Sequence, residues 1–279
     1  MNAYSQQGSG NRFVRQLLML AVTAVIAAPL VWMVGASLKS AEEFAADPHR
    51  FLPSDPRWEN YSEAFTVLPF WRCLANTLVL CIGSVAGTLF SCTLAAYAFA
   101  RLRWPGRDLV FGLVIATMLL PWQATMIPRF LLLREAGLYN SLGAIVWPTF
   151  LGEAFFIFLL RQFFRTIPQE LLDAARIDGC SEWGVLWRVV LPLSKPALAT
   201  VALFQFVAAW NDYGGPLLYL SDPAKFPLAY GLEQFVSSHS SETHLLMAAA
   251  VLFTLPIVVL FFAAQRTFIR GVATTGMKD

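Results

Sequence analysis

The chain has 279 residues, of which 57% are hydrophobic and only 14% charged, and its net charge is +2. Its mean hydropathy of +0.57 and its low charged fraction are unlike a soluble domain, in which about 25% of residues are charged. The composition therefore predicts an integral membrane protein and gives no indication of a nucleic-acid partner.

Six apolar runs are long enough to cross a membrane, which takes roughly 20 residues. They cover residues 17–38, 74–100, 109–127, 142–160, 197–220 and 245–268. The first run is too long for the apolar region of a signal peptide, so we keep it as a span. We predict an all-α integral membrane fold with six spans in a single transmembrane domain over residues 1–279.

Six spans place both termini on the same side of the membrane. Thirteen of the twenty Lys and Arg residues fall on that side and seven on the other. The positive-inside rule then makes the side with the termini cytoplasmic. The loops at 39–73, 128–141 and 221–244 lie outside, and the acidic, proline-punctuated first loop is expected to form an ordered cap with turns.

The cysteines and histidines give no sign of a metal site. Cys73, Cys81, Cys92 and Cys180 form no CxxC pair, and the three histidines lack the spacing of zinc ligands. We expect no metal and no disulfide.

A polar segment at about 166–196 interrupts the apolar pattern and carries helix signals. Residues Thr166 to Gln169 fit a capping box, and Gly179 fits a left-handed stop, so we predict a helix over 167–178. Ser181 can cap a second short helix, with Glu182 in its first turn. The pair Leu191 and Pro192 then returns the chain to the membrane.

The first of these helices has the features of an interface. Ala174, Ala175 and Gly179 lack bulk, so a partner can approach the backbone, while Asp173, Arg176 and Asp178 offer polar groups around them. The alternative is an amphipathic helix on the inner leaflet, where anionic headgroups would repel both aspartates.

The sequence from Asp173 to Gly179, followed after nine residues by Val189, Leu191 and Pro192, resembles the EAA loop of ATP-binding-cassette importer permeases. Asp173 replaces the usual Glu and Val189 the usual Ile. The stretches 96–101, 105–107, 159–164, 210–212 and 271–278 resemble the maltose-type carbohydrate permeases, in particular their smaller six-span subunit. The resemblance covers nearly the whole chain.

This resemblance implies a type I importer in a bacterial inner membrane. Such an importer has two permease subunits, here with a different and larger partner chain, two cytoplasmic ATPases and an external binding protein that delivers sugar. The helix at 173–179 would then be the coupling helix, seated in a cleft of the ATPase. The 221–244 loop would reach the binding protein, and the tail at 274–278 would touch the ATPases.

The chain contains no Gly-Lys dipeptide, which a phosphate-binding loop requires. We therefore expect no ATPase activity and no cofactor on this chain, with ATP and Mg²⁺ bound by the partner ATPases. A membrane-embedded enzyme is disfavoured because Glu153, Gln205 and Asp212 form no recognisable catalytic set. A proton-driven carrier that uses Glu153 is disfavoured by the docking segment.

Polar side chains within spans are candidates for the substrate pathway. Glu153 lies midway along one run and either faces the pore or bonds another helix. Gln205, Trp210, Asn211 and Asp212 lie in a run that glycines and a proline at 214–216 interrupt.

Other roles stay open for these residues. Asn211 and Asp212 could instead cap or pack a helix end, and Trp210 could be an interfacial anchor rather than a sugar platform. Gln123, between Pro121 and Pro128, is a further candidate for the pathway.

The residues do not identify the solute. A sugar is the leading expectation, from the resemblance, and a glycerol phosphodiester or phosphate ester is the alternative. A strongly cationic pore would favour that alternative, and the spans offer few interior Lys or Arg residues.

Overall fold

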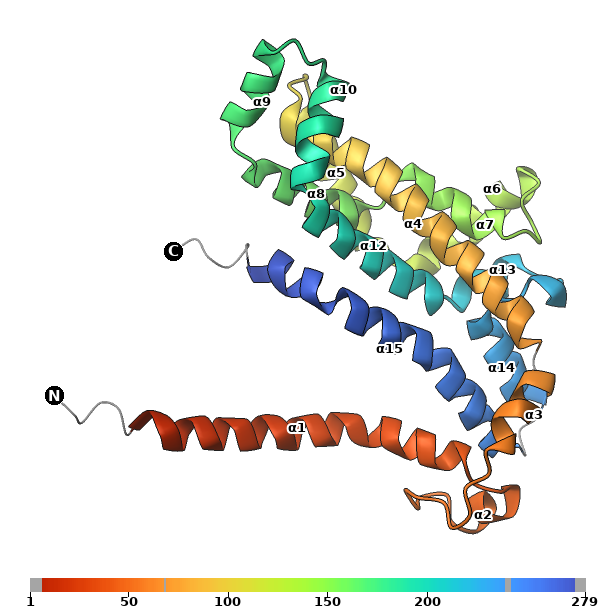
Figure 1. Ribbon diagram of the computed structural model, residues 1–279. Coiled ribbons are helices and arrows are strands. Elements are labelled where there is room, and N and C mark those ends of the chain that lie inside the picture. Colours follow the sequence, from red (N-terminus) through yellow and green to blue (C-terminus); the bar gives the residue numbers. More distant parts are fainter. Residues whose placement is uncertain (1–6, 68, 239–241, 274–279) are drawn as a thin grey trace. The chain divides into compact units, whose positions relative to one another are not determined.

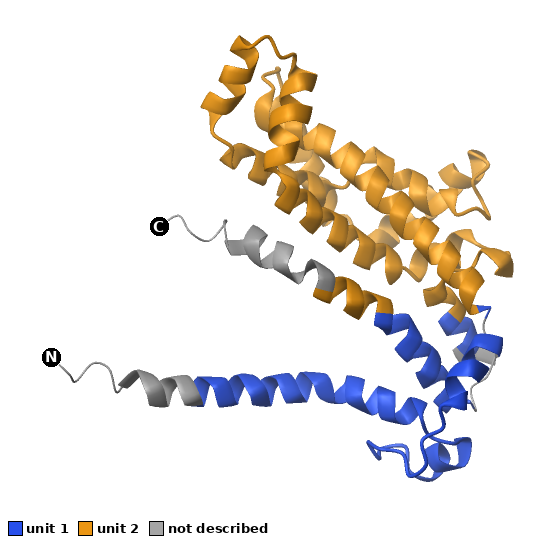
Figure 2. Ribbon diagram, viewed as in Figure 1, with its two compact units in different colours: residues 1–69, 232–255 blue, residues 70–231, 256–279 orange. Residues whose placement is uncertain are grey.

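The computed structural model describes residues 7–67, 69–238 and 242–273, and these residues form helices and connections without any strand (Figure 1). The expected all-α architecture is confirmed. The chain divides into two compact units, residues 1–69 with 232–255 and residues 70–231 with 256–279 (Figure 2). The single transmembrane domain stays a prediction.

Four helical segments are long and apolar enough to cross a membrane by themselves. They cover Val14–Ser37, Phe70–Arg101, Gly143–Thr166 and Thr243–Phe262. Two bent pairs pass the same test together, Arg107–Leu119 with Trp122–Glu135 and Glu182–Leu193 with Lys195–Trp210. The described residues therefore allow four spans, or up to six if each bent pair counts as one.

The run at 109–127 is not a continuous helix. It divides into α5 (Arg107–Ala116), the 3₁₀ turn η1 (Thr117–Leu119) and α6 (Trp122–Glu135), with a bend of 103° between the two halves. The break follows from Pro121, because a proline disfavours helical geometry in the residue before it. Leu120 is accordingly extended, with φ −79° and ψ 117°.

Two other runs are also interrupted. The run at 142–160 contains α7 (Gly143–Val146), the 3₁₀ helix η2 (Trp147–Leu151) and α8 (Ala154–Thr166), with a break at Gly152 and Glu153. The run at 197–220 divides into α12 (Lys195–Trp210) and α13 (Gly214–Tyr219). The expected interruption is present, but it lies at 211–213, ahead of the glycines.

The first unit contains α1 (Gln7–Ser37), α2 (Ala41–Ala46) and α3 (Glu59–Val67). The buried amide of Asn60 donates to the carbonyls of Ser37 and Lys39, both at 2.8 Å, and the Lys39 ammonium donates to the Asp47 carbonyl at 2.9 Å. These bonds order the 39–73 connection, as the sequence predicts.

The second unit is built around α4 (Phe70–Arg101), which packs on α8 and α12. Gly83 and Gly87, one helical turn apart, let α7 and η2 approach the α4 backbone closely, because Gly83 faces Val146 of α7 and Gly87 faces η2. A Cβ atom at Gly87 would lie 2.2 Å from the Thr149 hydroxyl oxygen. The Ser91 hydroxyl also donates to the Thr149 carbonyl at 2.8 Å, so α4 fixes where η2 and the break after it lie.

The last fifth of the chain adds η4 (Pro223–Lys225), α14 (Leu228–Ser238) and α15 (Thr243–Ala273). The 221–244 loop is therefore largely helical, although residues 239–241 lie outside the described residues, as does the tail at 274–278.

Candidate functional site

The polar segment begins later than the capping box predicts. Its first helix, α9, covers Gln169–Ile177, and its N-cap position is Pro168 without a side-chain cap. Thr166 is the last residue of α8, and its hydroxyl donates to the Phe163 carbonyl at 2.7 Å. The predicted capping box is wrong because α8 continues through Thr166 and uses that hydroxyl.

The end of α9 is as predicted. Gly179 has a φ of +82°, in the left-handed region. The Cys180 N–H donates to the Ala175 carbonyl and the Gly179 N–H to the Arg176 carbonyl, both at 3.0 Å. These two bonds form a Schellman motif, which satisfies the last carbonyls of the helix.

The second helix starts at the predicted cap. The Gly184 N–H donates to the Ser181 hydroxyl oxygen at 3.3 Å, and α10 covers Glu182–Val185. One π-helical turn, η3 (Leu186–Val190), and α11 (Leu191–Leu193) follow. The wide turn precedes Pro192, whose ring would clash with the carbonyl one turn earlier in a regular α-helix.

One face of this segment is buried in the core of the second unit. Leu172, Val185 and Val190 are each 0% exposed and pack with side chains of α4 and α8. Ala175 belongs to the same cluster and is 9% exposed. The expectation that Ala175 lies on an open patch is therefore wrong, because it follows Leu172 by three residues on the buried face.

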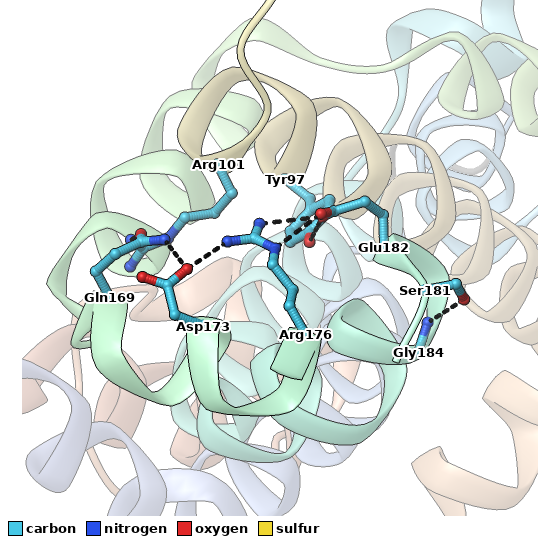
Figure 3. Close-up of polar contacts among 8 residues, drawn as sticks. All are labelled: Tyr97, Arg101, Gln169, Asp173, Arg176, Ser181, Glu182 and Gly184. Atoms are coloured by element: carbon cyan, nitrogen blue, oxygen red, sulfur yellow. Dashed lines mark hydrogen bonds and ion pairs between the residues drawn. The ribbon is translucent and has the colours of Figure 1, made fainter. Parts of the chain in front are cut away.

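A polar network links α9 and α10 to α4 (Figure 3). The Tyr97 hydroxyl donates to Glu182 Oε2 at 2.5 Å, and Arg176 Nε donates to Glu182 Oε1 at 2.9 Å. Arg176 Nη1 also donates to Asp173 Oδ1 at 2.8 Å, and Gln169 Nε2 donates to the same oxygen at 3.0 Å. Three elements are thus held by one hydrogen-bonded chain.

The network favours the charged forms of its members. Hydrogen bonds from Gln169 and Arg176 lower the pKa of Asp173. The hydrogen bond to Glu182 raises the pKa of Arg176 above its usual value. Asp173 and Arg176 are therefore both ionised at neutral pH.

The opposite face of α9 is open. Leu171, Ala174 and Ile177 repeat every three residues and are all exposed, with Ile177 at 86%. Asp178 and Gly179 continue this face, and a Cβ atom at Gly179 would meet no atom within 4 Å. We call residues 171, 174 and 177–179 the outer face of α9. An exposed apolar stripe of this kind is typical of an interaction surface.

A second candidate site is a cavity of about 610 Å³ between η1, α6, η2 and α13. Its lining combines charged, hydroxyl and aromatic groups. They are Arg129, Glu153, Asp212, Thr117, Thr125, Thr149, Trp122 and Tyr219, with small and apolar residues between them. Such a mixture suits a polar solute with several hydrogen-bonding groups.

Two of the predicted pathway residues line this cavity. Glu153 lies at the break before α8, where its N–H donates to the Cys92 sulfur at 3.3 Å. Asp212 also lines the cavity, and its Oδ1 accepts from the Gly215 N–H at 3.0 Å, which caps α13. Asp212 therefore binds the first turn of α13, while its direct contact with substrate stays a prediction.

The structure does not bring the other four candidates to the cavity. Gln123 is exposed on α6, while Gln205 and Trp210 are buried in α12 at 7% and 1% exposure. Trp210 stacks on Phe206 with the ring centroids 5.7 Å apart. Asn211 donates to the Val207 carbonyl at 2.8 Å and packs against its own helix end.

Sequence reasoning missed Trp122, Thr125 and Arg129, which place α6 along the cavity. The apolar run ends at residue 127, which predicts that Arg129 lies in the external 128–141 loop. In the structure α6 continues through Pro128 to Glu135. The spacing of three and then four residues between these polar and aromatic positions marks one helix face and could have identified them.

Metal binding finds no support in the part of the chain that the structure describes. Within it, no group of three or more His, Cys, Asp and Glu side chains could hold a metal ion. The four cysteines are free thiols.

Comparisons with known proteins agree on one family. A family model described as "Binding-protein-dependent transport system inner membrane component" matches residues 87–274. The chain is 33% identical to the sulfoquinovosyl glycerol transport system permease protein SmoH of Agrobacterium fabrum, over 90% of this chain and 88% of SmoH. It is also 33% identical to the sn-glycerol-3-phosphate transport system permease protein UgpE of Yersinia pestis, over 93% and 94%.

A solved structure shares the fold of almost the entire chain. It is the crystal structure of a bacterial ABC transporter involved in the import of the acidic polysaccharide alginate. The TM-score is 0.83 at 27% identity, and the match covers 96% of this chain and 100% of that chain.

Replacing Gly179 tests the Schellman end of α9. Gly179→Val forces a β-branched residue into the left-handed region and should cost about 1–2 kcal/mol, whereas Gly179→Asn should be nearly neutral. A Cβ atom at this position would meet no atom within 4 Å, so the difference is expected to report backbone strain. Thermal unfolding of the two purified variants measures it, and equal melting temperatures would contradict the assignment.

Proposed function

The chain belongs to the family of binding-protein-dependent transport system inner membrane components, and from this premise we propose that it is a sugar-translocating permease subunit of an ATP-driven importer. One observation carries the proposal: α9 buries one face in the core of the second unit and exposes its outer face. A rigid element with an open apolar stripe suits the transfer of movement from a soluble partner to the membrane helices.

We propose that α9 and α10 dock onto a separate ATPase through the outer face of α9. ATP and Mg²⁺ bind to that ATPase, and this subunit is not an enzyme. Leu171, Ala174 and Ile177 supply apolar contact area, and Asp178 and Gly179 lie at the tip. Asp173 and Arg176 contribute by holding α9 in place, because their charges are already paired within the chain.

The proposed assembly contains two ATPases, this subunit and a second, larger permease, which receive solute from an extracytoplasmic binding protein. The 221–244 loop, largely helical in the structure, is the proposed contact to the binding protein. Support for a binding protein comes from the family description. We further propose six spans with both termini in the cytoplasm. Support comes from the positive-inside count and from treating each of the two bent pairs, Arg107–Leu119 with Trp122–Glu135 and Glu182–Leu193 with Lys195–Trp210, as one span.

The proposed solute is a carbohydrate or a glycoside. The cavity supports this choice because carboxylate and hydroxyl groups can bond sugar hydroxyls, while Trp122 offers an aromatic face to a sugar ring. By their names, SmoH carries a sulfoquinovosyl glycerol and the solved transporter imports an acidic polysaccharide.

A phosphate ester is the second candidate solute, and Arg129 in the cavity lining favours it. The similarity to UgpE, named for sn-glycerol-3-phosphate, points the same way. Uptake by proteoliposomes that contain the whole complex, measured over a panel of oligosaccharides and glycerol phosphates, separates the two. Uptake of the phosphate esters alone would overturn the sugar proposal.

Ala174→Arg should disrupt docking. The added side chain projects from the outer face of α9, so it should block close approach of the ATPase without disturbing the core. We expect at least a tenfold loss of ATPase copurification, which corresponds to about 1.4 kcal/mol. Affinity purification of the complex measures the loss.

Ala136→Arg is the matched control, since Ala136 is exposed at the end of α6 and lies outside the α9–α10 segment. It should leave copurification unchanged. Normal assembly and uptake with Ala174→Arg would contradict the docking proposal.

Glu153→Gln tests the role of the cavity. The neutral amide keeps the shape but loses the charged acceptor, and a hydrogen bond to a charged group contributes about 1.5–3 kcal/mol. We expect the apparent KM for uptake to change about tenfold or more while assembly is preserved. Glu135→Gln, at an exposed position outside the cavity, should have no effect, and equal behaviour of the two variants would count against the cavity.

A further inference from the structure

Another cavity, of about 810 Å³, lies between the end of α4, the start of α5, the end of α8 and α9. Its lining is dominated by charged side chains. The arginines are Arg101, Arg103, Arg107, Arg161, Arg165 and Arg176, and the carboxylates are Asp108, Asp173 and Glu182. Six guanidinium groups face three carboxylates, so the cavity has an excess of three positive charges.

The three carboxylates are already engaged. Asp108 pairs with Arg107 at 3.0 Å, and Asp173 and Glu182 both pair with Arg176, at 2.8 and 2.9 Å. Among the described residues, no hydrogen bond or ion pair involves the guanidinium group of Arg103 or of Arg165. Two guanidinium groups of the lining are therefore available to a ligand.

One arginine of the lining, Arg161, is largely buried. Arg161 is only 8% exposed, its guanidinium lies 3.9 Å from the centre of the Phe111 ring, and its Nε donates to the Phe99 carbonyl at 3.3 Å. Its nearest carboxylate is Asp108 at 3.9 Å, and the Asp108 side chain is 74% exposed. A buried charge with so little compensation is costly, and an anion in the cavity would offset that cost.

An adjoining hollow of about 420 Å³ is lined by both charged and apolar side chains. It shares Arg103, Arg107 and Asp108 with the first cavity and adds Trp104 and Leu109. Leu109 is 71% exposed, and Leu113, one turn further along α5, is 61% exposed. Charged groups therefore lead directly to an apolar helix face, with a tryptophan at the boundary, as is common where a protein meets the membrane interface.

We propose that the 810 Å³ cavity binds a phosphate group, and that this phosphate belongs to the headgroup of an anionic membrane phospholipid whose acyl chains lie along α5. Guanidinium groups suit phosphate because they donate two parallel hydrogen bonds to it. Basic pockets between membrane helices bind such headgroups. The lipid would contact both α5 and α9 and so stabilise the position of α9, which bears the outer face.

The test uses the full-length subunit and counts retained phosphatidylglycerol by native mass spectrometry. Arg103→Gln with Arg165→Gln removes the two unengaged groups and should weaken binding about 25-fold, since each basic residue near an anionic surface contributes about fivefold. The matched control is Arg134→Gln with Arg188→Gln, which removes two exposed arginines outside the cavity and should leave binding unchanged.

Two further arms complete the experiment. The thermal stability of both double variants in phosphatidylcholine alone should equal that of the parent, so that lost binding is not lost folding. Millimolar inorganic phosphate should not displace phosphatidylglycerol. Equal lipid binding by both double variants would overturn the phosphate site, and displacement by inorganic phosphate would overturn the assignment to lipid.

Discussion

The burial of the inner face of α9 and α10 against α4 and α8 is the constraint on which the other features depend. A helix of nine residues such as α9 is not stable by itself in water. Leu172, Val185 and Val190 are removed completely from solvent, and burying such a side chain contributes about 1.5–3 kcal/mol. This packing turns a polar interruption between apolar runs into a fixed part of the second unit.

The packing also decides what the remaining faces can do. With Leu172 and Ala175 turned inward, the helical repeat places Leu171, Ala174 and Ile177 outward. Tyr97 reaches Glu182 and ties the same segment to α4. In the proposed docking role, a force on the outer face would reach α4 through this packing and through the Tyr97–Glu182 hydrogen bond.

Local chemistry could be predicted from the sequence. Gly179 ends α9 and Ser181 starts α10 because a left-handed glycine and a hydroxyl cap act within a few residues of themselves. The apolar runs likewise identified the helical membrane fold, since length and hydropathy are properties of the segment alone.

Features that depend on distant parts of the chain were not predictable in the same way. Whether Thr166 caps α9 or ends α8 depends on how far α8 packs along α4. Ala175 and Trp210 are buried because of neighbours that the sequence does not place beside them. Arg129 lies beyond the apolar run that ends at residue 127, so hydropathy predicts a loop there, whereas α6 accommodates Pro128 and continues to Glu135.

Hydrogen exchange of the backbone amides of α9 tests the central claim most directly. If α9 is mounted on α4 and α8 as described, its amides at 173–177 are protected in the isolated subunit. Added ATPase should then protect the outer face further without creating the helix. Rapid exchange of these amides until the ATPase is added would contradict the account, since α9 would then be formed by the partner rather than by its own core.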